Sequence, residues 1–287
     1  MISYISKISA VFILSLLVVS CEGSKTIDEV FATVTRGAVF RALDIESSSF
    51  NVFDPSSVFS ITAEVEDHEN GDLLDNVEVY IAFADNTDDA TDYSVEEQLF
   101  TTLERSMFTT GSNGLPTISF SISLAEISGA LNVAPENYTG GDNFTIRFEI
   151  HLTDGRRFSS DNVGATVSGG SFFRSPFIYS VNVNCVPLVP VEGEYTIELT
   201  DTYGDGWDGA FITVTIDGVS TDYTIEDGSE GTAMFTVPPG TQSLVLVYTA
   251  GNFEGEHIYS ITAPDGGVAA SDGPGPLPGE IVLSICP

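Results

Sequence analysis

The chain has 287 residues and a formal net charge of −33, with 9 Lys and Arg against 42 Asp and Glu. A surface of this charge repels phosphate backbones, which excludes nucleic acid as a partner. Hydrophobic residues make up 42% of the sequence, so the chain can form real cores, and its length suits two domains.

Residues 1–20 are typical of a secretory signal peptide. Lys7 supplies a positive charge, and the apolar run at residues 8–19 is shorter than the roughly 20 residues that a spanning helix needs. The run ends in Val19-Ser20-Cys21, which resembles a bacterial lipoprotein box. That resemblance implies cleavage before Cys21 and a lipid anchor on it, and several acyl chains anchor stably. The alternative is an ordinary signal peptide with Cys21 as a stray thiol.

Residues 21–29 comprise Cys21 and a polar stretch that predicts a short tether. Acidic residues soon after the Cys resemble the surface-export signals of some Gram-negative lipoproteins. We therefore expect a protein that is lipid-anchored in the outer membrane and exposed on the cell surface.

Residues 30–186 show short apolar runs separated by turns, which is typical of an immunoglobulin-like β-sandwich. The strongest hairpin signal is Asp154-Gly155, between alternating residues 143–152 and 156–159. Residues 58–65 and 77–83 are expected to pair across the turn at 67–72. Other expected elements are strands at 30–34, 38–40 and 177–183 and a helix at 124–131.

This domain resembles the N-terminal immunoglobulin-like domains of SusE-like outer-membrane lipoproteins. The likeness runs from the short helix through Gly140-Gly141-Asp142 and the Thr153-Asp154-Gly155-Arg156 hairpin to Ser175-Pro176-Phe177. It covers about half of the chain after the signal. The resemblance implies a role beside a TonB-dependent transporter and SusD-like complex of an uptake system. It carries over no binding residue, because those families bind glycans through later domains.

Pro187, Pro190 and Gly193 indicate a linker over residues 187–193. Residues 194–287 then predict a second antiparallel, jelly-roll-like sandwich, which makes the whole chain all-β. Its expected strands are 194–200, 210–216, 220–225, 232–237, 243–250, 257–262 and 280–286, with a loop at 271–279.

Two cysteines remain if Cys21 is lipidated. Cys185 and Cys286 bracket the second domain, and the envelope beyond the inner membrane permits disulfides. We expect them to form a bridge that joins the two ends of this domain, and two buried free thiols are the alternative.

The second domain contains the sequence Asp-Thr-Tyr-Gly-Asp-Gly-Trp-Asp-Gly at residues 201–209. Its glycines allow close approach of the backbone, and Asp201, Asp205 and Asp208 are candidate ligands for Ca²⁺. No Lys or Arg follows Arg174, while sixteen acidic residues do, so a cation would relieve their repulsion. The alternative is a turn in which the aspartates cap their own backbone.

The loop resembles the Asp-x-Tyr-Gly-Asp-Gly-Trp-Asn/Asp-Gly motif of secreted and surface proteins, a motif with no function attached. Trp207 and Tyr203 are candidate ligand-binding residues, because exposed aromatic rings stack on sugars. The alternative for Trp207 is packing over the end of the core.

We do not expect an enzyme. His68, His151 and His257 lie in unrelated contexts, and no nucleophile elbow, zinc-spaced His pair or phosphate loop is present. The expected function is a non-catalytic accessory component of an outer-membrane uptake system that binds glycan or another nutrient. The alternative is a structural or adhesive surface lipoprotein whose calcium-stabilised C-terminal domain contacts other proteins.

Overall fold

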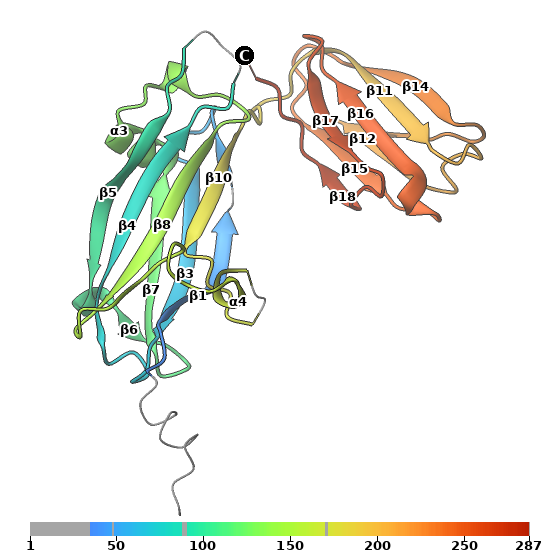
Figure 1. Cartoon of the computed structure of the whole chain (residues 1–287). Helices are drawn as coiled ribbons and strands as arrows, with labels where there is room; N and C mark the ends of the chain where they lie inside the picture. The colour runs from blue at the N-terminus through green and yellow to red at the C-terminus, as the bar shows by residue number, and fades with distance from the viewer. Residues whose placement is uncertain (1–34, 48, 88–90, 170–171, 287) are drawn as a thin grey trace, which may run out of the picture. The chain divides into compact units, whose positions relative to one another are not determined.

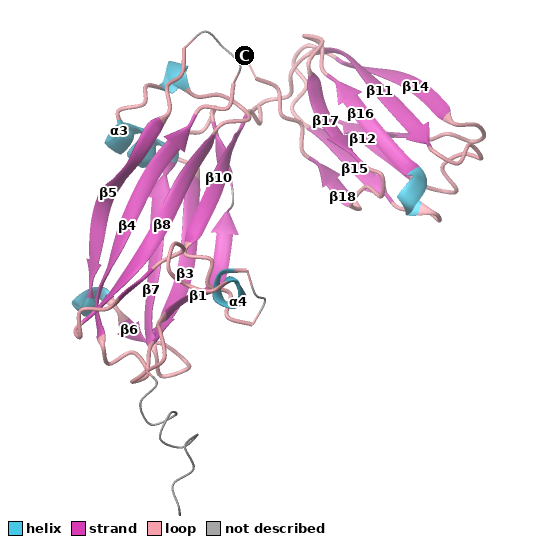
Figure 2. Cartoon of the chain, viewed as in Figure 1, coloured by secondary structure: helices cyan, strands magenta, loops and turns pink. Residues whose placement is uncertain are grey.

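The computed structural model describes residues 35–47, 49–87, 91–169 and 172–286. The predicted signal peptide, Cys21 and its tether, and the expected strand at 30–34 lie outside these residues. The described chain consists mainly of antiparallel strands, as predicted for an all-β protein (Figures 1 and 2). None of its helices is long and apolar enough to cross a membrane.

The N-terminal sandwich contains two sheets. One sheet has the order β1-β3-β7-β6, and the other has the order β2-β10-β8-β4-β5, with β9 on β8. The strands of the first sheet are β1 (Val39–Ser47), β3 (Val58–Glu66), β6 (Thr109–Thr110) and β7 (Pro116–Ser123). Those of the second are β2 (Ser49–Asn51), β4 (Leu74–Ala84), β5 (Val95–Glu104), β8 (Asn143–Leu152), β9 (Arg157–Phe158) and β10 (Ile178–Asn184).

The core of this sandwich is built from alternating apolar residues. In β8 every second side chain from Phe144 to Phe148 is buried, because successive residues of a strand point to opposite faces. Phe148 stacks on Phe40 of β1 at 4.7 Å and meets Phe120 of β7 edge-on at 5.6 Å. These aromatic contacts join the two sheets into one core.

The expected pairing of residues 58–65 with 77–83 is wrong. β3 pairs with β1 and β7, whereas β4 pairs with β8 and β5, so the intervening turn passes from one sheet to the other. Buried Asp67 stabilises this turn by accepting the N–H groups of Glu69, Gly71 and Leu73. The hairpin at Asp154-Gly155 is confirmed, since β8 pairs with β9.

The helix α3 (Leu124–Leu131) has the bounds expected from the sequence. It begins with a capping box, in which Glu126 N–H donates to Ser123 Oγ and Ser123 N–H donates to the Glu126 carboxylate. It ends at Asn132 in the left-handed conformation. The other helical turns are short: η1 (Arg105–Met107), η2 (Pro135–Asn137), α4 (Ala165–Ser168) and η3 (Glu254–Glu256).

The C-terminal sandwich has a separate core and two four-stranded sheets, with the orders β14-β11-β16-β17 and β13-β12-β15-β18. The strands of the first are β11 (Gly193–Asp201), β14 (Glu230–Val237), β16 (His257–Thr262) and β17 (Val268–Asp272). Those of the second are β12 (Phe211–Ile216), β13 (Val219–Tyr223), β15 (Leu244–Thr249) and β18 (Gly279–Ile281). The sequence did not predict β2, β5, β6, β7 or β17, and β18 is shorter than the expected strand.

Cys185 and Cys286 form a disulfide, with their Cα atoms 4.9 Å apart. Ser284 Oγ accepts the N–H of Cys185, and Ile285 N–H donates to the Cys185 carbonyl, so hydrogen bonds flank the bridge. The disulfide closes a loop with a sequence separation of 101 that contains every strand of the C-terminal sandwich.

Candidate cation site in the C-terminal sandwich

The loop at residues 202–210 joins β11 of one sheet to β12 of the other. Two neighbouring segments hold it in place through backbone hydrogen bonds. Thr202 N–H donates to the backbone carbonyl of Glu256, and Asn252 N–H donates to the backbone carbonyl of Asp208. Trp207 N–H donates to Ile225 on the other side. Segments from three parts of the sequence therefore meet at this end of the sandwich.

The carboxylate of Asp201 organises the loop. Its Oδ2 accepts the N–H groups of Gly204, Asp205 and Gly206 at 2.8–2.9 Å, and its Oδ1 accepts that of Tyr203 at 3.1 Å. Burial raises the pKa of Asp201, but the four amide donors outweigh it and hold this pKa below its ordinary value. The turn that the sequence offered as an alternative is therefore formed.

Gly206 is required where the loop passes closest to its neighbour. Its φ is +100°, and a Cβ there would lie 2.9 Å from the carbonyl oxygens of Ile225 and Glu226. Any side chain would displace the backbone that carries the donors to Asp201.

Trp207 is a core residue and is not a candidate for stacking on a ligand. Its side chain is 0% exposed, its Nε1–H donates to the Thr200 carbonyl at 3.0 Å, and it stacks on His257 at 5.4 Å. It also meets Tyr248 edge-on at 5.8 Å. The ring closes the end of the core, because an indole can bury its apolar surface while its single donor is satisfied.

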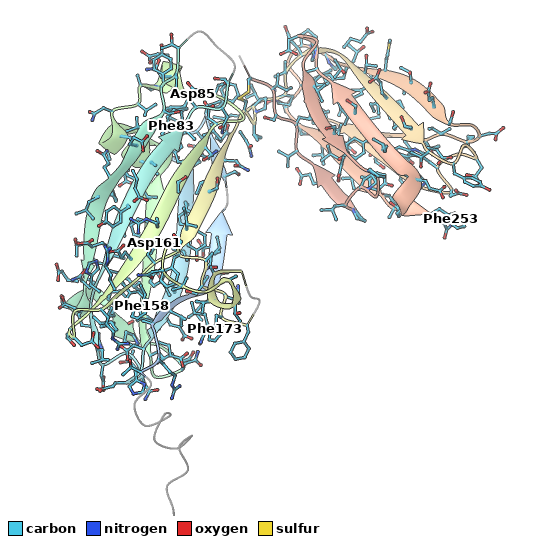
Figure 3. The ribbon with its side chains drawn as sticks, in the orientation of Figure 1. Phe83, Asp85, Phe158, Asp161, Phe173 and Phe253 are labelled. Carbon is cyan, nitrogen blue, oxygen red and sulfur yellow. A yellow bond between two sulfur atoms is a disulfide. The ribbon has the colours of Figure 1, made fainter. Side chains whose placement is uncertain are left out.

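Tyr203 is placed differently. Its side chain is 76% exposed, on the same loop. Phe253, in the adjoining segment, is 68% exposed and has a φ of +56°, unusual for a residue with a bulky side chain. Figure 3 shows the ring of Phe253 pointing away from the sheets. Tyr203 is thus accessible to a ligand.

The structure changes one member of the predicted metal-binding trio. Asp201, Asp205 and Glu256 each offer an oxygen atom, and these atoms lie within 4.8 Å of one another. Asp208 is outside this group and lines a pocket of about 370 Å³. Glu256 comes from η3, more than forty residues after the loop at 202–210. No spacing pattern in the sequence identifies it as a ligand.

The electrostatic state of the trio favours a cation. Partial loss of hydration, together with the negative charges of Asp208 and Asp201, raises the pKa of Asp205. Desolvation and the charges of Asp201, Asp205 and Asp208 raise the pKa of Glu256 in the same way. A divalent ion would reverse this repulsion. Because Asp201 Oδ2 already accepts three N–H groups, the oxygens best able to coordinate are Asp201 Oδ1 and those of Asp205 and Glu256.

The raised pKa values predict a pH dependence of the metal-free protein. Groups whose pKa is raised on folding contribute stability below their unfolded pKa, near 4, that is lost as the pH rises through the folded value. Without divalent ions, the Asp205→Asn/Glu256→Gln variant is therefore expected to unfold at higher urea concentration than the parent at pH 7. The difference should vanish toward about pH 4. A constant difference from pH 4 to 7 would contradict this assignment.

A second group of possible ligands lies on the N-terminal sandwich and is already neutralised. Glu78, Glu149 and His151 come together on β4 and β8. Arg147 and Arg157 contact Glu149 at 3.1 and 3.3 Å. The hydrogen bond to Glu78 and burial raise the pKa of Tyr80 to about 12. Cationic side chains therefore balance the charge of this group, whereas no Lys or Arg lies in the domain that contains the C-terminal trio.

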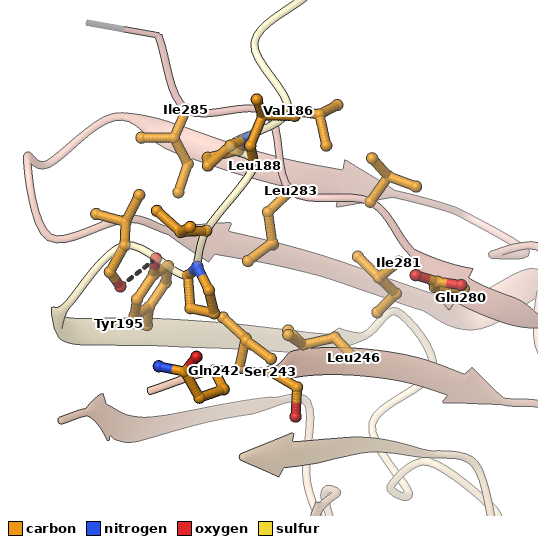
Figure 4. Close-up of a pocket in the computed structure, with 16 residues that line it drawn as sticks. Val186, Leu188, Tyr195, Gln242, Ser243, Leu246, Glu280, Ile281, Leu283 and Ile285 are labelled. Carbon is orange, nitrogen blue, oxygen red and sulfur yellow. Dashed lines mark hydrogen bonds between the residues drawn. The ribbon is translucent and has the colours of Figure 1, made fainter. Parts of the chain in front are cut away.

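An apolar pocket of about 340 Å³ lies where the predicted linker meets the C-terminal sandwich (Figure 4). Leu188, Leu246, Ile281 and Leu283 line it, and Tyr195 Oη donates to the Val191 carbonyl at 3.0 Å. The Val191 carbonyl is thus hydrogen-bonded to this sandwich, whereas Leu188 and Val189 earlier in the segment are 69% and 72% exposed.

No family model matches this sequence, and no curated protein matches it. Among solved structures, two crystal forms of a bacterial adhesin from Mobiluncus mulieris, with intramolecular disulfide, isopeptide and ester cross-links, have a TM-score of 0.23. They are 11% and 12% identical over 88% of this chain and 93% and 94% of theirs. Dimeric latent PorU from Porphyromonas gingivalis has a TM-score of 0.24 and is 13% identical, over 86% of this chain and 20% of its own. Likeness at these scores carries no information on function.

Proposed function

We propose that this chain is a non-catalytic, lipid-anchored protein of the outer cell surface whose C-terminal sandwich is a calcium-stabilised module for contacts with other proteins. The observation that supports it most is the cluster of Asp201, Asp205 and Glu256 in a domain without Lys or Arg. In this proposal Cys21 carries the lipid and the outer membrane holds the anchor.

Ca²⁺ suits the site because it accepts carboxylate and carbonyl oxygens in flexible geometry. Asp205 and Glu256 would be its principal carboxylate ligands, with Oδ1 of Asp201 as the third. The ion would join the loop at 202–210 to η3 and so stabilise the end of the sandwich.

Calcium is expected to raise the melting temperature of the full chain. At a concentration about 100 times its Kd, the ion should add about 2.7 kcal/mol to the free energy of unfolding of the C-terminal sandwich. Fluorescence of Trp207, the single Trp of the chain, reports on this sandwich in a thermal melt.

Two matched variants test whether Glu256 or Asp208 is the third ligand beside Asp201 and Asp205. Asp205→Asn/Glu256→Gln should abolish the response to calcium, whereas Asp208→Asn should retain most of it. An unchanged melt with calcium and with chelator would refute the site. Loss of the response in Asp208→Asn as well as in the double variant would return Asp208 to the ligand set.

Glycan binding is the second candidate function, with the chain as an accessory to a TonB-dependent transporter and SusD-like complex. The exposure of Tyr203 and Phe253 on adjoining segments supports it, because two accessible rings can stack on sugars. Retardation of the full chain in polysaccharide gels, lost in Tyr203→Ala, would favour this candidate over protein contacts.

A further inference from the structure

The edge strand β14 lies at the end of its sheet and pairs with β11 along its whole length of eight residues, without a register shift. Edge strands expose unpaired N–H and C=O groups and are templates for another chain. Among the described residues, the backbone of residues 231–237 forms hydrogen bonds with β11 alone.

The other edges of the described sheets are short, irregular or charged, whereas β14 has eight residues and carries a single charge, Glu230, at its first position. β1 and β5 have register shifts and carry charged residues, and the segment at 172–177 also covers β1 through Arg174 and Ser175. β13 and β17 have five residues each, including Asp222 and Asp272 respectively. The remaining edge strands, β2, β6, β9 and β18, have three residues or fewer. Residues 231–237 contain no charge and no proline.

The two faces of β14 specify what an added strand would carry. Outward-facing Thr232, Met234 and Thr236 are exposed, and Met234 is 59% exposed. On the inward face, Ala233 is only half-buried, while Phe235 and Val237 belong to the core. Alternate side chains of an added strand would extend this core, and they should be apolar.

The outer face of the sheet favours positively charged side chains in an added strand. Glu194 and Glu198 of β11 lie exposed opposite Thr236 and Thr232. Neighbouring strands are about 4.8 Å apart, so an added strand would lie about 10 Å from β11. Lys or Arg side chains can span much of this distance with their stems on Met234. The domain itself supplies no such cation, since no Lys or Arg follows Arg174.

We infer that β14 is a docking edge for a partner strand that alternates apolar residues with Lys or Arg. Main-chain hydrogen bonds to residues 232–237 would hold it, and Glu194 and Glu198 would select its outward side chains. A second copy of this chain fits poorly, because each copy has a net charge of −33. The inference names a surface for the protein contacts of the proposed function, and rests on it to that extent, but needs no calcium.

The test uses the full chain and a synthetic peptide of about ten residues that alternates valine and lysine. Binding is measured by fluorescence anisotropy, and hydrogen exchange locates it on the protein. The peptide is expected to bind and to slow exchange of the amides at 232–237. A peptide of the same charge with proline in place of alternate valines is expected to bind at least about tenfold more weakly, because it cannot form the ladder.

Two variants decide where the peptide binds. Met234→Lys places a like charge on the edge and is expected to weaken binding about tenfold. Val219→Lys adds the same charge on β13, where Val219 is 73% exposed, and should change binding less than about twofold.

Equal binding of the proline peptide, or equal effects of the two lysine substitutions, would overturn the inference in favour of non-specific attraction. Slowed exchange at 232–237 in the absence of peptide, together with a dimer in light scattering, would assign the edge to a second copy. If calcium does not stabilise the chain but the peptide binds at β14, the cation site fails and the docking edge stands; the opposite result removes the docking edge alone.

Discussion

Replacement of Trp207 with alanine is expected to lower the free energy of unfolding of the C-terminal sandwich by about 3 to 5 kcal/mol, the range for deletion of a large buried ring. The side chain is fully buried between His257 and Tyr248, so the loop end cannot easily collapse into the space that it leaves. Urea denaturation followed by circular dichroism measures the loss.

Trp207→Phe and Tyr203→Ala are the matched controls for this prediction. The phenylalanine variant keeps most of the apolar contact but leaves the Thr200 carbonyl without its indole donor, for an expected loss of about 1 to 3 kcal/mol. Tyr203→Ala removes an exposed ring from the same loop and should stay within about 0.5 kcal/mol of the parent. Equal effects at Trp207 and Tyr203 would contradict the core assignment.

Loss of the disulfide is the second large effect. Replacing Cys185 and Cys286 with serine should destabilise the C-terminal sandwich by up to about 4.7 kcal/mol, the chain-entropy value for a loop of roughly 100 residues. The effect arises in the unfolded chain, which gains conformational freedom when its ends are released. Trp207 fluorescence during urea unfolding reports it directly.

A reductant provides the control for the disulfide variant. It should destabilise the parent by about as much as the double substitution and leave the variant unchanged. The hydrogen bonds from Ile285 and to Ser284 remain possible in the variant, so its folded structure should be preserved. A parent that unfolds at the same urea concentration with and without reductant would refute the prediction.

Strand content followed from local patterns, because alternation and turn residues act over a few neighbours. The sequence located β16 at residues 257–262 and α3 at 124–131, and the helix carries its own signal in Ser123 and Glu126. β5 was missed because it is an edge strand in which Leu103 alone is buried, so its apolar alternation is weak. β7, in contrast, does have the alternation of a half-buried strand, in residues 116–123.

Sheet membership could not be predicted in the same way. The runs that became β3 and β4 are separated by a turn and look like a hairpin, but a turn can equally carry the chain to the opposite sheet. That choice depends on which strands compete for each edge, and the competitors β7 and β8 lie far along the sequence.

The candidate site likewise combines features that local sequence predicts with features that only long-range packing decides. Composition and local order established a carboxylate-rich, glycine-rich loop in a domain without Lys or Arg, and they selected Asp201 and Asp205. Packing brought Glu256 to them from a distant segment, left Asp208 outside the 4.8 Å group, and buried Trp207. The residue types of a loop can be read from its own sequence, but the neighbours that complete a site are set by long-range strand pairing. Here β11 pairs with β16, and this pairing places Asp201 opposite His257 and next to Glu256.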